Sequence, residues 1–132
     1  MSNELASILI ADDNDDLRSA LGDLFSDYEY RVRTATDGFS ALAEMRSELP
    51  DVLISDLEMP RMSGFELLFV VRERFPEVGV IAMSGAYSGN EVPRGVAADA
   101  FYPKGGTSKS RLPELVDAII VRNCPRTRRW AV

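Results

Sequence analysis

Short apolar runs alternate along this chain with stretches in which apolar residues recur every three or four positions. Short continuous apolar runs are typical of buried strands, whereas strict alternation is typical of an edge strand. The first type occurs at residues 8–11, 52–54, 78–83 and 100–102, and the second at residues 30–35. The pattern therefore predicts five strands.

Helical spacing of apolar residues fills most of the intervals between these strands. An amphipathic helix is predicted over residues 15–27, and a second one begins near Asp37 and stops before Pro50. A third is predicted between Gly64 and Pro76, and a last one over residues 112–120.

The interval SGAYSGNEVPRGVAADA, residues 84–100, breaks this regularity. It contains Gly85, Gly89, Pro93 and Gly95, and each of these residues is costly inside a helix. We expect a short, irregular or mobile fourth helix here.

Alternating strands and helices predict an α/β fold with a parallel sheet that is covered on both faces. In such sheets the functional crevice lies at the carboxyl ends of the strands. Polar residues at those ends are therefore the first candidates for a site.

The composition narrows the class of protein. The chain has 132 residues, enough for one domain, and no apolar run approaches the roughly 20 residues of a membrane span. With 21 acidic against 15 basic residues, we expect no direct nucleic-acid binding. The single Cys124 forms no internal disulfide and favours a cytoplasmic location. The absence of histidine excludes histidine-based acid–base chemistry and histidine metal ligands.

Acidic residues stand at the ends of two predicted strands. Asp12 and Asp13 follow the first strand, and Asp56 follows the third. At about 5 Å and an effective dielectric constant near 20, each carboxylate pair repels by about 3 kcal/mol. A hard divalent cation such as Mg²⁺ relieves that repulsion. The alternative is that Asp12, Asp13, Asn14 and Asp15 only cap the first helix.

Two further strand ends carry groups that bind phosphate. Ser84 ends the fourth strand, and Lys104 follows the fifth. A lysine pairs with phosphate oxygens as a compact charge, and a serine hydroxyl donates to them. Taken singly, each is also an ordinary turn or surface residue, so their order along successive strands is the informative feature.

From about Ser7 to Val121 the chain resembles the receiver domain of response regulators in two-component signalling. The five polar positions fall where that family has its functional residues, and the run D-x-x-M-P-x-x-x-G, from Asp56 to Gly64, is the most specific local signature. The resemblance implies a flavodoxin-like, doubly wound, five-stranded parallel sheet with strand order 2-1-3-4-5, as in chemotaxis regulators.

The resemblance also implies roles for the acidic positions. Asp56 would be the phosphoacceptor, a carboxylate nucleophile that forms an acyl phosphate. Asp13 and Asp56 would bind Mg²⁺ directly, together with the backbone carbonyl of Glu58. Asp12 would act mostly through water, and Lys104 would hold a phosphoryl oxygen.

The switch elements follow from the same resemblance. Ser84 would be the hydroxyl drawn to the phosphoryl group, and Phe101 would turn inward as Ser84 moves. The chain departs from the family after Lys104, where Gly105 replaces the usual proline. We therefore expect a trans peptide bond and a looser loop there.

The expected domain organisation is a receiver over residues 1–122 and a basic tail over residues 123–132. The tail contains Arg126, Arg128, Arg129 and Trp130. The chain is either a stand-alone receiver or a part of a larger protein, and its downstream partner is unknown.

The expected function is that of a phosphorylation-controlled switch. A histidine kinase or a histidine phosphotransfer protein would donate the phosphoryl group, and the domain would catalyse only its own phosphorylation and dephosphorylation. One alternative is an Mg²⁺-dependent phosphohydrolase with an aspartyl-phosphate. Such enzymes commonly carry a second aspartate where Glu58 stands, and they have a cap domain. Another alternative is a receiver-like binding module that is never phosphorylated.

Overall fold

The computed structural model describes residues 6–86, 89, 91–105 and 108–123. Its core is one five-stranded sheet in which every pair of neighbouring strands is parallel. The strand order β2-β1-β3-β4-β5 confirms the predicted order. The strands are β1 (Ser7–Ala11), β2 (Arg31–Ala35), β3 (Val52–Asp56), β4 (Gly79–Ser84) and β5 (Ala100–Pro103).

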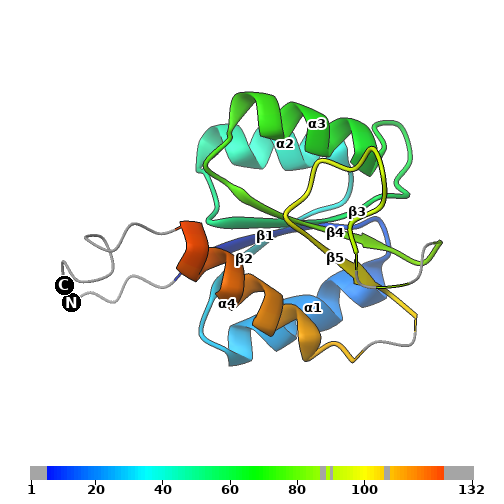
Figure 1. Cartoon of the computed structure of the whole chain (residues 1–132). Helices are drawn as coiled ribbons and strands as arrows, with labels where there is room; N and C mark the ends of the chain where they lie inside the picture. Colours follow the sequence, from blue (N-terminus) through cyan, green and yellow to red (C-terminus); the bar gives the residue numbers. More distant parts are fainter. Residues whose placement is uncertain (1–5, 87–88, 90, 106–107, 124–132) are drawn as a thin grey trace.

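Helices cover both faces of this sheet (Figure 1). The helices α2 (Gly38–Ser47) and α3 (Gly64–Arg74) lie on one face, and α1 (Asp15–Asp27) and α4 (Arg111–Asn123) lie on the other. The predicted first, second and third helices are confirmed to within a few residues. The predicted last helix is α4, which begins one residue earlier and ends three residues later than its apolar pattern.

Side chains cap the first three helices. Asn14 accepts a hydrogen bond from the backbone of the first turn of α1. Asp37 and Ser40 form a capping box at α2, and Ser63 and Glu66 form one at α3. These bonds satisfy backbone N–H groups that a helix start leaves without partners. The residue that caps α1 is therefore Asn14, and the preceding acidic pair is available for another role.

Two apolar clusters pack against the two faces of the sheet. Residues such as Leu9 and Leu53 face the cluster that includes residues of α2 and α3, whereas Ile8 and Ile54 face the cluster that includes residues of α1 and α4. Every residue of β1, β3 and β4 is buried. Central strands covered on both faces explain why the sequence shows apolar runs there.

The segment between β4 and β5 differs from the expectation of an irregular fourth helix. Its described residues, 85–86, 89 and 91–99, form bends and a turn and include no helical residue. Gly89 and Gly95 have φ angles of 92° and 80°, a left-handed conformation that interrupts a right-handed helix. Val92 and Val96 nevertheless pack against the cluster on the α2 and α3 face.

Within the described ranges, no helix has the length and hydropathy needed to cross a membrane. The predicted basic tail lies outside the described residues except for Asn123, so its separation from the receiver domain stays a prediction.

Candidate functional site at the carboxyl edge of the sheet

Strand register brings the two predicted acidic positions together. β1 and β3 are neighbours with Ala11 opposite Ser55, so Asp12 lies beside Asp56 at the carboxyl edge of the sheet. One carboxylate oxygen from each of Asp12, Asp13 and Asp56 lies within 4.8 Å of the others. Asp12 and Asp56 are 0% and 3% exposed, whereas Asp13 is exposed. The predicted cluster is therefore formed, with two of its three carboxylates buried.

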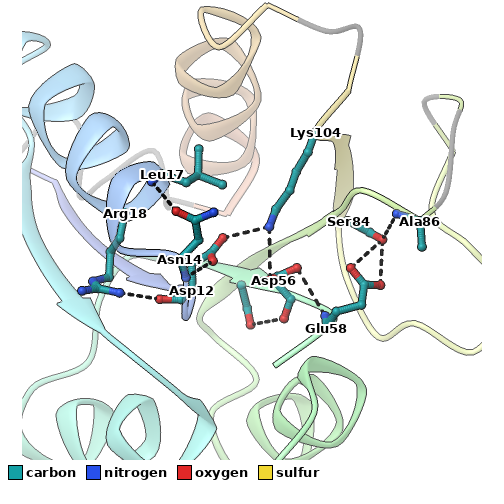
Figure 2. Close-up of polar contacts among 10 residues, drawn as sticks. Asp12, Asn14, Leu17, Arg18, Asp56, Glu58, Ser84, Ala86 and Lys104 are labelled. Carbon is teal, nitrogen blue, oxygen red and sulfur yellow. Dashed lines mark hydrogen bonds and ion pairs between the residues drawn. The ribbon is translucent and has the colours of Figure 1, made fainter. Parts of the chain in front are cut away.

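Lys104 follows β5, which lies on the side of β4 away from β3, and its side chain points toward this cluster (Figure 2). Its backbone N–H donates to the carbonyl of Ser84 at 2.9 Å, which extends the pairing of β5 with β4. Its ammonium nitrogen lies 3.1 Å from Oδ2 of Asp12 and 3.1 Å from Oδ2 of Asp56. Burial alone would lower the pKa of Lys104, but pairing with these two carboxylates raises it, so the ammonium stays charged.

The Asp56 carboxylate is held in an unfavourable environment for its charge. Burial, and then the negative charge of Asp12, raise its pKa from 3.8 to about 6. Lys104 and the Glu58 backbone N–H, which lies 3.3 Å from Oδ1, offset only part of this effect.

The oxygens of this site suit a hard cation. Oδ2 of Asp12 is buried and has no hydrogen-bond partner of acceptable geometry, although Lys104 lies at ion-pair distance. A buried carboxylate oxygen without a hydrogen bond is costly. Carboxylate oxygens are the protein ligands that Mg²⁺ prefers. Asp12, Asp13 and Asp56 therefore fit an Mg²⁺ ion, while a contribution from the Glu58 carbonyl remains a prediction.

Ser84 lies at the end of β4 and is fully buried. Its hydroxyl donates to the Glu58 carboxylate, with oxygen distances of 2.8 and 3.0 Å, and accepts from the Ala86 backbone N–H at 2.9 Å. Glu58 was predicted to contribute only its backbone carbonyl, and this side-chain contact was not predicted. Its position two residues beyond the strand end was the available signal.

Phe101, the predicted aromatic switch, is 3% exposed and belongs to the cluster on the α2 and α3 face. The ring is thus already inside the protein while Ser84 contacts Glu58. The expected coupling between movement of Ser84 and inward rotation of Phe101 stays a prediction.

Close packing against the neighbouring backbone requires a glycine at position 64. A Cβ atom built there would lie 2.1 Å from the Asp56 carbonyl oxygen and 2.6 Å from the Leu57 Cα. The Gly64 N–H donates to the Leu57 carbonyl at 3.0 Å. The start of α3 therefore lies directly against the backbone of Asp56 and Leu57, which accounts for the glycine of the D-x-x-M-P-x-x-x-G signature.

Two arginines outside the predicted set of site residues contact the loops around the site. Arg18 donates to the backbone carbonyl of Asp12 at 2.8 Å and to Asp15 at 2.6 Å. Arg61, which has a φ angle of 65°, pairs with Asp37 at the start of α2. The i,i+3 spacing of Asp15 and Arg18 on α1 was a readable signal, whereas nothing local indicated the Arg61 contact.

Residues 8–103 match the response regulator receiver domain. The chain belongs to this family. Among curated relatives, it is 38% identical to nitrogen assimilation regulatory protein NtrX of Azorhizobium caulinodans, over 59% of this chain and 18% of the relative. It is 43% identical to sensor histidine kinase TmoS of Ectopseudomonas mendocina, over 58% of this chain and 8% of the relative.

Solved receiver structures share the fold. Chemotaxis protein CheY4 of Vibrio cholerae matches with a TM-score of 0.79 and 27% identity, over 88% of this chain and 99% of that one. Response regulator protein TrrA of Thermotoga maritima, in complex with Mg²⁺-BeF, matches with a TM-score of 0.78 and 28% identity, over 87% and 99% of the two chains.

Family membership supports a phosphoacceptor role in a two-component system. The relatives include regulators, sensor kinases and a protein-glutamate methylesterase of Rhodopseudomonas palustris. The chain spans only 8% to 33% of the length of the curated relatives it matches. Their complete activities therefore do not transfer to this chain.

Proposed function

We propose that this domain accepts a phosphoryl group on Asp56 from a histidine kinase or a histidine phosphotransfer protein, and then signals to a downstream protein. The observation that carries the proposal is the position of the Lys104 ammonium, 3.1 Å from both Asp12 and Asp56. A cation at this point neutralises charge on the acceptor and is in reach of an incoming phosphoryl group.

The transfer is a single displacement at phosphorus. A carboxylate oxygen of Asp56 forms the new P–O bond while the P–N bond of the phosphohistidine breaks, and the departing imidazole takes a proton from solvent. Burial and Asp12 raise the pKa of Asp56 to about 6, so its carboxylate is still ionised at neutral pH and can act as the nucleophile. The 132 residues contain no histidine, so the donor histidine lies outside this domain.

Asp12, Asp13 and Asp56 are the side chains that would hold Mg²⁺ in this proposal. The bound ion supplies charge neutralisation for the phosphoryl oxygens. Lys104 would hold a phosphoryl oxygen, and the Arg18 side chain fixes the Asp12 backbone by donating to its carbonyl. A cytoplasmic location is part of the proposal, because a single cysteine suits a reducing compartment.

Labelling with a small phosphodonor tests the proposal. With Mg²⁺ and acetyl phosphate, intact-mass spectrometry should detect one added phosphoryl group on the wild type and none on the Asp56→Asn variant. Equal labelling of the two proteins would refute Asp56 as the acceptor. Absence of labelling in the wild type would favour an unphosphorylated binding module. Steady turnover of a generic phosphate ester would favour a phosphohydrolase.

A further inference from the structure

The Ser84 hydroxyl is fully engaged in this structure. A serine hydroxyl has one proton to donate, and that proton is directed at the two oxygens of the Glu58 carboxylate, at 2.8 and 3.0 Å. The hydroxyl oxygen also accepts from the Ala86 N–H at 2.9 Å. Because Ser84 is fully buried, solvent offers no additional partner.

Glu58 and the acceptor carboxylate approach Ser84 from the same strand end. Asp56 pairs with Met83, the residue before Ser84, and the Glu58 N–H lies 3.3 Å from the Asp56 side chain. Figure 2 shows the Glu58 side chain turned away from Asp56 and toward Ser84. A phosphoryl group on Asp56 would therefore offer the single proton of Ser84 a second acceptor beside the Glu58 carboxylate.

We propose that the Glu58 carboxylate is a built-in competitor for the Ser84 hydroxyl. In the unphosphorylated domain it holds the hydroxyl, and it releases the hydroxyl when a phosphoryl group forms on Asp56. Glu58 is thus a positioning residue that acts through Ser84 and sets how readily the phosphorylated state forms. This inference rests on the proposed phosphorylation of Asp56.

Release of Glu58 has a physical driving force. A phosphoryl group adds a charge of about −1.5 to −2 near the Glu58 carboxylate, and like charges repel. The Glu58 residue is exposed, so its carboxylate can turn into water without losing packing. Bonds from a hydroxyl to a charged acceptor are stronger than bonds between neutral groups, so the competition affects the equilibrium measurably.

Loss of the Glu58 charge would by itself also favour an anion at Asp56. A double-mutant cycle separates this charge effect from competition for the Ser84 hydroxyl. Removal of Glu58 weakens repulsion of any anion at Asp56, whether or not Ser84 is present. Competition for the hydroxyl, in contrast, disappears when Ser84 is replaced by alanine. The coupling between positions 58 and 84 is therefore the quantity that reports the proposed role.

The experiment measures the affinity of beryllofluoride, in excess Mg²⁺, for wild type, Glu58→Ala, Ser84→Ala and the double variant. Fluorine NMR detects the bound phosphoryl mimic. We expect Glu58→Ala to tighten binding by about three- to tenfold beyond its effect in the Ser84→Ala background, the factor that one net hydrogen bond is worth. A gain of equal size in both backgrounds would overturn the competition and leave charge repulsion as the explanation.

Glu58→Gln is the matched control, because its amide oxygen still accepts from Ser84 but carries no charge. It should give the charge-dependent part of the gain and a smaller coupling to Ser84 than Glu58→Ala gives. Equal coupling for the two variants would also overturn the proposal. Failure of this inference and failure of the proposed function give different results. If the proposed function is wrong, wild type binds no beryllofluoride and gains no phosphoryl group on Asp56.

Discussion

Two buried aspartates near the carboxyl edge of the same sheet have opposite electrostatic environments. Asp37, which follows β2, is 6% exposed, and Asp56, at the end of β3, is 3% exposed. A hydrogen bond from the Ser40 backbone, together with Arg61, lowers the pKa of Asp37. Burial and Asp12 raise the pKa of Asp56 to about 6.

The difference lies in the backbone groups that surround each carboxylate. Asp37 is the N-cap of α2, where free N–H groups and the positive end of the helix dipole stabilise a negative charge. Asp56 lies against a second carboxylate, and its one backbone bond, from Glu58, is long at 3.3 Å. The first carboxylate is stabilised in its charged form, whereas the charge of the second is destabilised, as the proposed roles in metal binding and phosphoryl transfer require.

The largest expected difference between Asp37 and Asp56 variants is in the stabilisation that Mg²⁺ provides. At a hundredfold excess over its dissociation constant, Mg²⁺ should stabilise wild type by about 2.7 kcal/mol, because only the folded state assembles the site. Asp37→Asn should retain this gain, and Asp56→Asn should lose most of it. Thermal melts in EDTA and in Mg²⁺, with NaCl at matched ionic strength as the control, measure the effect. A full gain in Asp56→Asn would place the metal elsewhere.

The next effect is a loss of stability at α2. Asp37→Ala should lower the free energy of unfolding by about 1–2 kcal/mol at neutral pH, because the cap is removed. Asp37→Asn should recover most of this loss, since its amide oxygen also caps a helix. The lowered pKa of Asp37 means that its charge stabilises the fold above the unfolded pKa, and that this contribution disappears as pH falls through the folded pKa. Urea unfolding of both variants at several pH values provides the measurement.

Asp56→Asn should have the opposite effect in the absence of metal. The folded pKa of about 6 exceeds the unfolded value of 3.8, so ionisation of Asp56 favours the unfolded chain. The penalty is absent below pH 4, develops as pH rises toward 6 and is complete above it. Allowing for solvent screening, it amounts to about 1–2 kcal/mol. Melts in EDTA at pH 4.5 and pH 8 should show a clearly larger stabilisation by Asp56→Asn at the higher pH. Destabilisation at pH 8 would contradict the assigned environment.

The smallest effect concerns Asp13, the exposed member of the cluster. Asp13→Asn should raise the metal-free stability by less than about 1 kcal/mol, because solvent already screens its repulsion. It should also reduce the stabilisation that Mg²⁺ provides, since one ligand is lost. Calorimetric titration with Mg²⁺ tests the second part. Unchanged affinity would make Asp13 a bystander and leave Asp12 and Asp56 as the ligands.

The strands, the four helices of the described residues and the order of the site residues could be predicted because they depend on local patterns. Buried strands produce apolar runs, and parallel strands place their carboxyl ends at one edge, so Asp12, Asp56, Ser84 and Lys104 had to converge. The segment before β5 could be predicted only as irregular, because propensity argues against a regular helix without defining what replaces it.

The sequence by itself determined the fold class, the family and the residues at the edge of the sheet, because periodicity and strand-end chemistry are read along the chain. Only the tertiary structure decided that Asp12 is buried while Asp13 is exposed, and that Glu58 contacts Ser84, 26 positions away. Burial and side-chain direction depend on segments that meet only in the folded protein, and those two properties set the pKa of Asp56 and the partner of the Ser84 hydroxyl.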